Sequence, residues 1–148
     1  MRTRLAGWAV LAFAMLAGWS PSALAASVSE LIVVIDNLRS SQGQVRIALW
    51  RGPDGFTELD AALVKTARPA DPGQIYFKFK GLPPGRYAVA SFHDENGNGE
   101  FDRTWVGLPD EGLGFSNGAW IKLGPPAFEE AAVDVTPSPK VIVVSLRY

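Results

Sequence analysis

The sequence predicts an all-β fold, a single two-sheet sandwich of about seven strands with at most one short helix. Apolar residues alternate with polar residues in several short stretches, which is the pattern of half-buried strands. Turn-forming residues separate these stretches, and the chain holds 15 glycines and 11 prolines. Only one segment has helical spacing, and it is short. This combination is typical of a small β-sandwich.

Residues 1–25 are predicted to be a signal peptide, and residues 26–148 to be the sandwich domain. Arg2 and Arg4 form a positive start, and an apolar run follows from Leu5 to Trp19. Such a run is shorter than the roughly 20 residues that cross a bilayer, so a membrane anchor is not expected. Ala23–Ala25 has the small-x-small pattern of a cleavage site. We therefore expect the mature chain to begin at Ala26 and to be periplasmic or secreted.

The expected strands lie at 31–35, 45–50, 75–80, 87–92, 119–123, 133–135 and 141–148. The first is a continuous apolar run, which suits a central strand. The third has the clearest alternation, because Ile75, Phe77 and Phe79 alternate with Tyr76, Lys78 and Lys80. In the last, every second residue from Ile142 to Leu146 is apolar on one face.

The segments between these strands have the residues that turns require. Ser40–Gly43 is expected to form a hairpin between the first two strands, and Pro83–Gly85 to join the third and fourth. Thr136–Pro139 precedes the last strand. The one helical spacing, with Thr57 as a possible N-cap, is made by Phe56, Leu59 and Leu63.

The charge and the cysteine content restrict the possible functions. The chain has 14 basic and 15 acidic residues, and without Arg2 and Arg4 the mature domain is acidic. An acidic domain is not expected to bind nucleic acid, because phosphate binding needs a basic surface. The chain has no cysteine. Its core, or a bound ion, must therefore stabilise it in place of disulfides.

The segment from Asp94 to Asp102 predicts a calcium-binding loop. Oxygen-bearing side chains occupy relative positions 1, 3, 5 and 9, and Gly99 stands at position 6. A hard cation takes six to eight oxygen ligands, and a tight turn directs alternate side chains toward one centre. The expected metal ligands are Asp94, Asn96, Asn98, Glu100 through its main-chain carbonyl at position 7, and Asp102.

This loop departs from the full EF-hand pattern at position 12, where Trp105 replaces the bidentate glutamate. Asp110 or Glu111 would have to supply that ligand, so weak Ca²⁺ binding is expected, with a Kd of about 10⁻⁴ to 10⁻³ M. Six acids and one base lie between Asp94 and Glu111, and their repulsion is relieved by water or by a shared cation. The alternative is a turn in which Asp and Asn side chains cap their own backbone without an ion.

A catalytic interpretation depends on His93, the only histidine. It would act as a base with Ser91 or Ser116 as the nucleophile, or with a nearby acid, in a periplasmic hydrolase. Ser116 does not lie in the G-x-S-x-G pattern, and a lone histidine at the end of a strand is usually structural. With one histidine and no cysteine, a zinc site is not expected either.

Several aromatic residues lie in or near the long segment from Arg103 to Phe128, among them Trp105, Phe115 and Trp120. One interpretation is an aromatic platform that binds a peptide or a glycan. The other is that a loop of this length buries its own aromatic residues in order to stay ordered.

Several motifs in fixed order resemble those of one bacterial family, domain of unknown function 2141. The motifs are GLPPGRYAV at 81–89, HDENGNG at 93–99, GLP at 107–109 with Glu111-Gly112, GFSN at 114–117 and PPAFE at 125–129. The resemblance covers nearly all of the mature chain and implies an exported bacterial protein with no assigned activity. The proline-glycine turn is also similar to that of prealbumin-like and carboxypeptidase-regulatory-like domains, which implies an immunoglobulin-like or prealbumin-like sandwich.

These observations favour a non-enzymatic binding or structural module with a calcium loop. The calcium would hold a surface that contacts an unknown protein or glycan. The alternative function is the hydrolase that uses His93 with Ser116 or a nearby acid.

Overall fold

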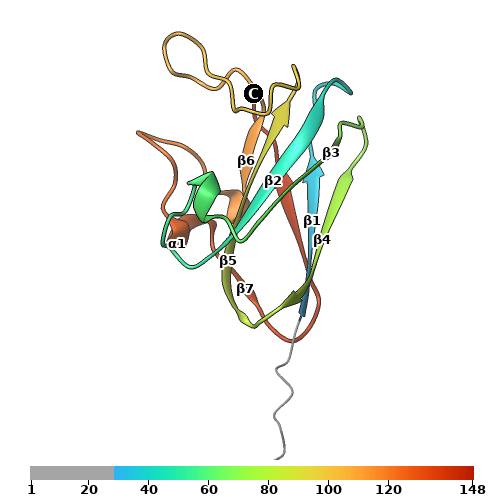
Figure 1. Cartoon of the computed structure of the whole chain (residues 1–148), viewed down its shortest axis with the longest axis vertical. Helices are drawn as coiled ribbons and strands as arrows, with labels where there is room; N and C mark the ends of the chain where they lie inside the picture. The colour runs from blue at the N-terminus through green and yellow to red at the C-terminus, as the bar shows by residue number, and fades with distance from the viewer. Residues whose placement is uncertain (1–28) are drawn as a thin grey trace, which may run out of the picture.

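The structure is a computed structural model that describes residues 29–148, so the expected signal peptide and its cleavage site lie outside it. Eight strands form two sheets, which confirms the all-β prediction (Figure 1). Within the described residues, no helix is long and apolar enough to span a membrane. The strands are β1 (Ser29–Asp36), β2 (Gln44–Arg51), β3 (Val64–Pro69), β4 (Ile75–Leu82), β5 (Gly85–Asp94), β6 (Leu113–Phe115), β7 (Val133–Val135) and β8 (Lys140–Ser145).

The first sheet has the strand order β4-β1-β8, and the second has β3-β2-β5-β6, with β7 paired to the start of β5. β1 lies centrally, antiparallel to β4 and parallel to β8. The expected hairpin at Ser40–Gly43 is wrong, because β1 and β2 belong to different sheets and this turn crosses between them. Pro83–Gly85 likewise passes from β4 in the first sheet to β5 in the second.

The main core lies between the two sheets. The alternation on β4 is confirmed, since Ile75, Phe77 and Phe79 are buried and the residues between them are exposed. The same period of two places the buried core residues Val45, Ile47 and Leu49 on the inner face of β2. Burial of these side chains is the main source of stability in a domain that has no disulfide.

A second apolar cluster covers part of the outer face of the second sheet. Phe56 lies at its centre and makes edge-to-face contacts with Trp50, Phe115 and Phe128, with ring centroids 5.3, 6.4 and 5.7 Å apart. Short helical turns hold this layer in place, the 3-10 turns η1 (Leu59–Ala61) and η2 (Ser116–Gly118) and the helix α1 (Phe128–Ala131). Figure 1 shows α1 and η1 beside β2 and β5, away from the first sheet.

Three local predictions in this layer are wrong. The expected helix near Phe56 is only the three-residue turn η1, and Thr57 is no N-cap, since its φ is 74° and Glu58 precedes the turn. The expected strand at 119–123 is irregular chain, and the strand that pairs with β5 is β6, at 113–115. β3 was not expected, because its Lys and Arg side chains hide the alternation of this edge strand.

Candidate metal-binding loop

The predicted calcium loop begins at the last residue of β5. In the antiparallel register of β2 and β5, Gln44 lies opposite Asp94 and Arg46 lies opposite Phe92. These side chains therefore share the outer face of the second sheet. The chain then turns back through Asn96–Asp102 before a projecting hairpin at 103–109, drawn in gold at the top of Figure 1.

Asp94 is fully buried, and its two carboxylate oxygens have different surroundings. Oδ2 accepts three hydrogen bonds, from Arg46 Nε at 2.7 Å, the Gly99 amide at 3.0 Å and Gln44 Nε2 at 3.2 Å. Oδ1 is buried and has no hydrogen-bond partner. Burial, the largest influence, raises the pKa of Asp94, but these hydrogen bonds together lower it, so the side chain is ionised at neutral pH.

The next ligand candidates converge on Asp102. Asn96 and Asn98 donate from their Nδ2 atoms to Asp102 Oδ2, at 2.6 and 2.9 Å. Their Oδ1 atoms accept from the amides of Asn98 and Glu100, at 2.9 and 2.8 Å. The self-capping turn of the alternative interpretation is therefore present. A carbonyl oxygen has two lone pairs, so an oxygen that accepts one such bond can still bind a cation.

Glu111, one of the two residues considered for the missing ligand, turns back into this loop. It is buried, and its Oε1 and Oε2 accept from the amides of Glu95 and Asp102, at 3.0 and 3.2 Å. Burial is the largest cause that raises its pKa, and the charges of Asp102 and Asp94 raise it further. Asp110 contributes only backbone bonds and is exposed.

The arrangement does not form a complete coordination shell. Among residues 29–148, no group of three or more His, Cys, Asp or Glu side chains lies at metal-binding distances. The side chain of Glu100 is exposed, so only its carbonyl remains a candidate. Closing a shell would require Asn96 and Asn98 to turn their amide nitrogens away from Asp102.

His93 has a structural environment. It is fully buried, and its Nε2 lies 2.8 Å from the Gln42 carbonyl oxygen, which only accepts. Nε2 therefore donates to this carbonyl, and Nδ1 lies 2.8 Å from the Tyr148 hydroxyl. That hydroxyl also accepts from the Arg39 amide at 3.1 Å. Both ring nitrogens are thus occupied.

Neither predicted nucleophile contacts His93. Ser116 Oγ accepts from the Val89 amide at 2.9 Å and bonds the Ala131 carbonyl. Ser91 Oγ donates to the Arg46 carbonyl at 2.8 Å. Both hydroxyls are buried and hold strands and turns together. Neither serine reaches His93, and Glu95, whose Oε1 lies 3.9 Å from Nδ1, is bonded to Ser40 and Arg39. We therefore do not propose the hydrolase.

The aromatic residues of the 103–128 segment divide into two groups. Phe115 and Phe128 are buried in the second cluster, as expected of a self-packing loop. Trp105 is instead 97% exposed at the tip of the 103–109 hairpin, with Val106 and Leu108 exposed beside it. The hairpin itself is ordered by bonds from the amides of Thr104 and Gly107, each 2.8 Å long.

Sequence reasoning missed Gln44 and Arg46 as part of the site, because both lie 50 residues or so before the loop and reach it only through the strand register. It also missed Gly43, whose φ is 66° and whose added Cβ would lie 1.9 Å from the Asp94 carbonyl oxygen. Only glycine lets the β1–β2 turn approach the loop this closely.

Comparison with known proteins gives one match. A family model described as "Uncharacterized protein conserved in bacteria (DUF2141)" matches residues 33–143, which include most of both sheets and the loop. No curated protein and no solved structure matches the chain. The resemblance to this family is confirmed, and the similarity to prealbumin-like domains is not.

Proposed function

The chain belongs to this family of uncharacterised bacterial proteins, and on that premise we propose that it is an exported, non-enzymatic binding module stabilised by a calcium ion at Asp94–Asp102. The Asp94 carboxylate carries this proposal. Three donors fix it through Oδ2, while Oδ1 is buried without a partner. A buried charged oxygen without a partner is costly, and a cation is the ligand that relieves that cost.

Glu111 supports the same ion. Burial is the largest cause that raises its pKa, and the charges of Asp102 and Asp94 raise it further, so its negative charge is unfavourable in this loop. A divalent cation would remove this repulsion, and Glu111 would take the place of the glutamate that Trp105 replaces. The remaining ligands would be the oxygens of Asn96, Asn98 and Asp102 and the carbonyl of Glu100. Oxygen ligands of this kind favour calcium over zinc or copper.

The binding is expected to be weak. Arg46 already neutralises part of the Asp94 charge at 2.7 Å, and two of the ligands are neutral amides. Both features lower the affinity for a cation, so a Kd of about 10⁻⁴ to 10⁻³ M fits this loop. A weak site is useful outside the cell, where millimolar calcium is common, and this agrees with the export expected from residues 1–25.

The surface that the ion would position is the 103–109 hairpin, which follows the loop directly. Exposed Trp105, Val106 and Leu108 form an apolar tip that a protein or glycan partner could cover. Tryptophan is enriched at binding hot spots because one side chain buries a large area. The calcium ion would hold the base of this hairpin, and the tip would supply the contact.

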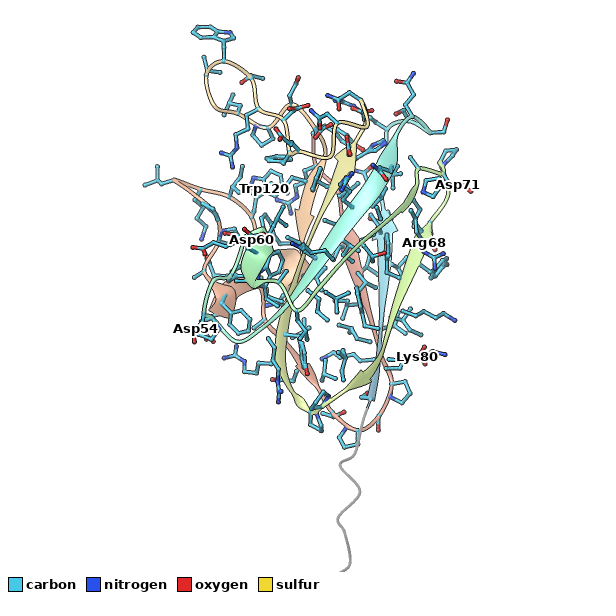
Figure 2. The ribbon with its side chains drawn as sticks, viewed as in Figure 1. Asp54, Asp60, Arg68, Asp71, Lys80 and Trp120 are labelled. Carbon is cyan, nitrogen blue, oxygen red and sulfur yellow. The ribbon has the colours of Figure 1, made fainter. Side chains whose placement is uncertain are left out.

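Isothermal titration calorimetry of the protein with CaCl₂ tests the site directly. We expect one calcium per chain at a millimolar or submillimolar Kd, and at least tenfold weaker binding of MgCl₂, which needs a tighter octahedral shell. Asp94→Asn should abolish binding, whereas Asp54→Asn, at an exposed acid far from the loop (Figure 2), should leave it unchanged. Absence of heat and of retained calcium on dialysis at 10 mM CaCl₂ would refute the proposal.

A further inference from the structure

The outer face of the second sheet carries a partly open groove of about 500 Å³ beside the calcium loop. Two rows of cross-strand neighbours form its floor. One row runs from Lys65 through Ala48 and Ala90 to Phe115, and the other runs from Ala67 through Arg46 and Phe92 to Leu113. Figure 2 shows Asp60 and Trp120 on this side of the molecule and Lys80, on β4, on the opposite side.

The groove exists because alanines stand where larger side chains would fill the space. Ala48 and Ala90 lie directly opposite each other in the middle of β2 and β5. The layer formed by Phe56 and Phe128 covers the neighbouring part of the same face and packs against Ala90, but both alanines still line the groove. Phe101 and Ile121 form apolar walls. The result is a concave apolar surface within the usual size range of small-ligand sites.

The charges around the groove have one sign. Its lining includes Arg46, Lys65 and Arg103 and no acidic residue. This is notable in a chain with more acids than bases. Arg46 is engaged by Asp94, whereas Arg103 lies 5.4 Å from the Phe101 ring and has no ion pair among the described residues. The nearest acid to Lys65 is Asp60, 3.6 Å away and fully exposed.

We propose that this groove binds a medium-chain fatty acid, with its alkyl chain over Ala48 and Ala90 and its carboxylate at Lys65 or Arg103. The apolar floor and walls fit the chain, and the basic rim fits the carboxylate. The volume suits a chain of about ten carbons, since sites of this size enclose most of a small ligand. This site is separate from the proposed calcium site, and its test is run in EGTA so that the two can fail independently.

Titration with straight-chain carboxylates from hexanoate to dodecanoate, each below its micellar concentration, tests the alkyl site. Each added methylene should strengthen binding about fourfold until the groove is full, after which the affinity should level off. Decanol and decyltrimethylammonium should bind at least tenfold more weakly than decanoate. Equal binding of decanol and decanoate, or no binding of decanoate at 1 mM, would overturn the proposal.

Two pairs of variants locate the ligand. Ala90→Leu should weaken decanoate binding at least tenfold by filling the groove, whereas Ala70→Leu, outside the groove, should not. Circular dichroism checks that each variant is folded. The double variant Lys65→Glu, Arg103→Glu should weaken decanoate but not decanol, and Lys80→Glu should change neither.

Sedimentation in the absence of ligand measures the oligomeric state. It tests the remaining possibility, that a second copy of the chain occupies the groove. A monomer agrees with the fatty-acid site. A dimer that Ala90→Leu dissociates would overturn it, because the groove would then be an interface between copies.

Discussion

Asp94→Asn changes one buried carboxylate into an amide of the same shape. The variant can keep an oxygen toward Arg46 and the Gly99 amide, but an NH₂ group then occupies the position of the Oδ1 atom that has no partner. A metal ligand is lost and one negative charge disappears. The substitution therefore separates the structural role of Asp94 from the proposed metal site.

The magnitude follows from binding linkage. For a Kd of about 10⁻⁴ to 10⁻³ M, 10 mM calcium stabilises the folded state of the wild type by about 1.4–2.7 kcal/mol. In a domain of this size, that gain raises the melting temperature by about 5–10 °C. In EGTA, Asp94→Asn should cost about 1–2 kcal/mol, because the ion pair with Arg46 becomes a hydrogen bond between a charged guanidinium and a neutral amide.

Differential scanning calorimetry in 10 mM CaCl₂ and in EGTA measures both effects. We expect calcium to raise the melting temperature of the wild type and of Asp54→Asn, and to leave that of Asp94→Asn unchanged. A wild type that melts at the same temperature in both buffers contradicts the reasoning. So does an equal calcium shift in Asp94→Asn, which would place the ion elsewhere.

Three further predictions concern the surroundings of the loop. Gly43→Ala should cost about 3–4 kcal/mol in urea unfolding, because its Cβ would strike the Asp94 carbonyl, whereas Gly52→Ala, also at positive φ but with open space, should cost about 1–2 kcal/mol. Tyr148→Phe should cost about 1–3 kcal/mol, because the His93 ring nitrogen and a backbone amide each lose a partner; Tyr76→Phe, whose hydroxyl is exposed, should stay within about 0.5 kcal/mol. The pKa of Asp94 lies below its ordinary 3.8, so its charge stabilises the fold above that pH, and this stability is lost as the pH falls through the folded-state pKa. Below about pH 4, the urea concentration at the unfolding midpoint should therefore decrease more steeply for the wild type than for Asp94→Asn.

Much of the fold could be predicted because period-2 alternation is a local property. β1, β2, β4, β5, β7 and β8 were predicted from the pattern of apolar and polar residues alone. The pairing of the strands was not found, because Ser40–Gly43 has the composition of a hairpin turn whether it joins neighbours or crosses between sheets. β6 was missed because its three residues include Gly114, which packs against the Ser145 backbone and leaves no alternation to detect.

At the candidate site, too, local features could be predicted from the sequence and contacts between distant residues could not. The spacing from Asp94 to Asp102 indicated which side chains gather, and Asn96, Asn98 and Asp102 do contact one another. Spacing along the chain does not reveal partners that arrive from another strand, so the role of Arg46 required the structure. The structure was also needed to show that Glu111, and not the exposed Asp110, turns into the loop.

The parallel pairing of β1 with β8 has a consequence for how the chain folds. These strands join residues more than a hundred positions apart, and β1 lies between β4 and β8 in its sheet. A polypeptide emerging from the ribosome cannot complete this sheet until residues 140–145 are available. Contacts between distant residues slow folding, because a long loop must close before they form. Newly made chains should therefore remain without a finished core, and accessible to chaperones, until β8 has been synthesised.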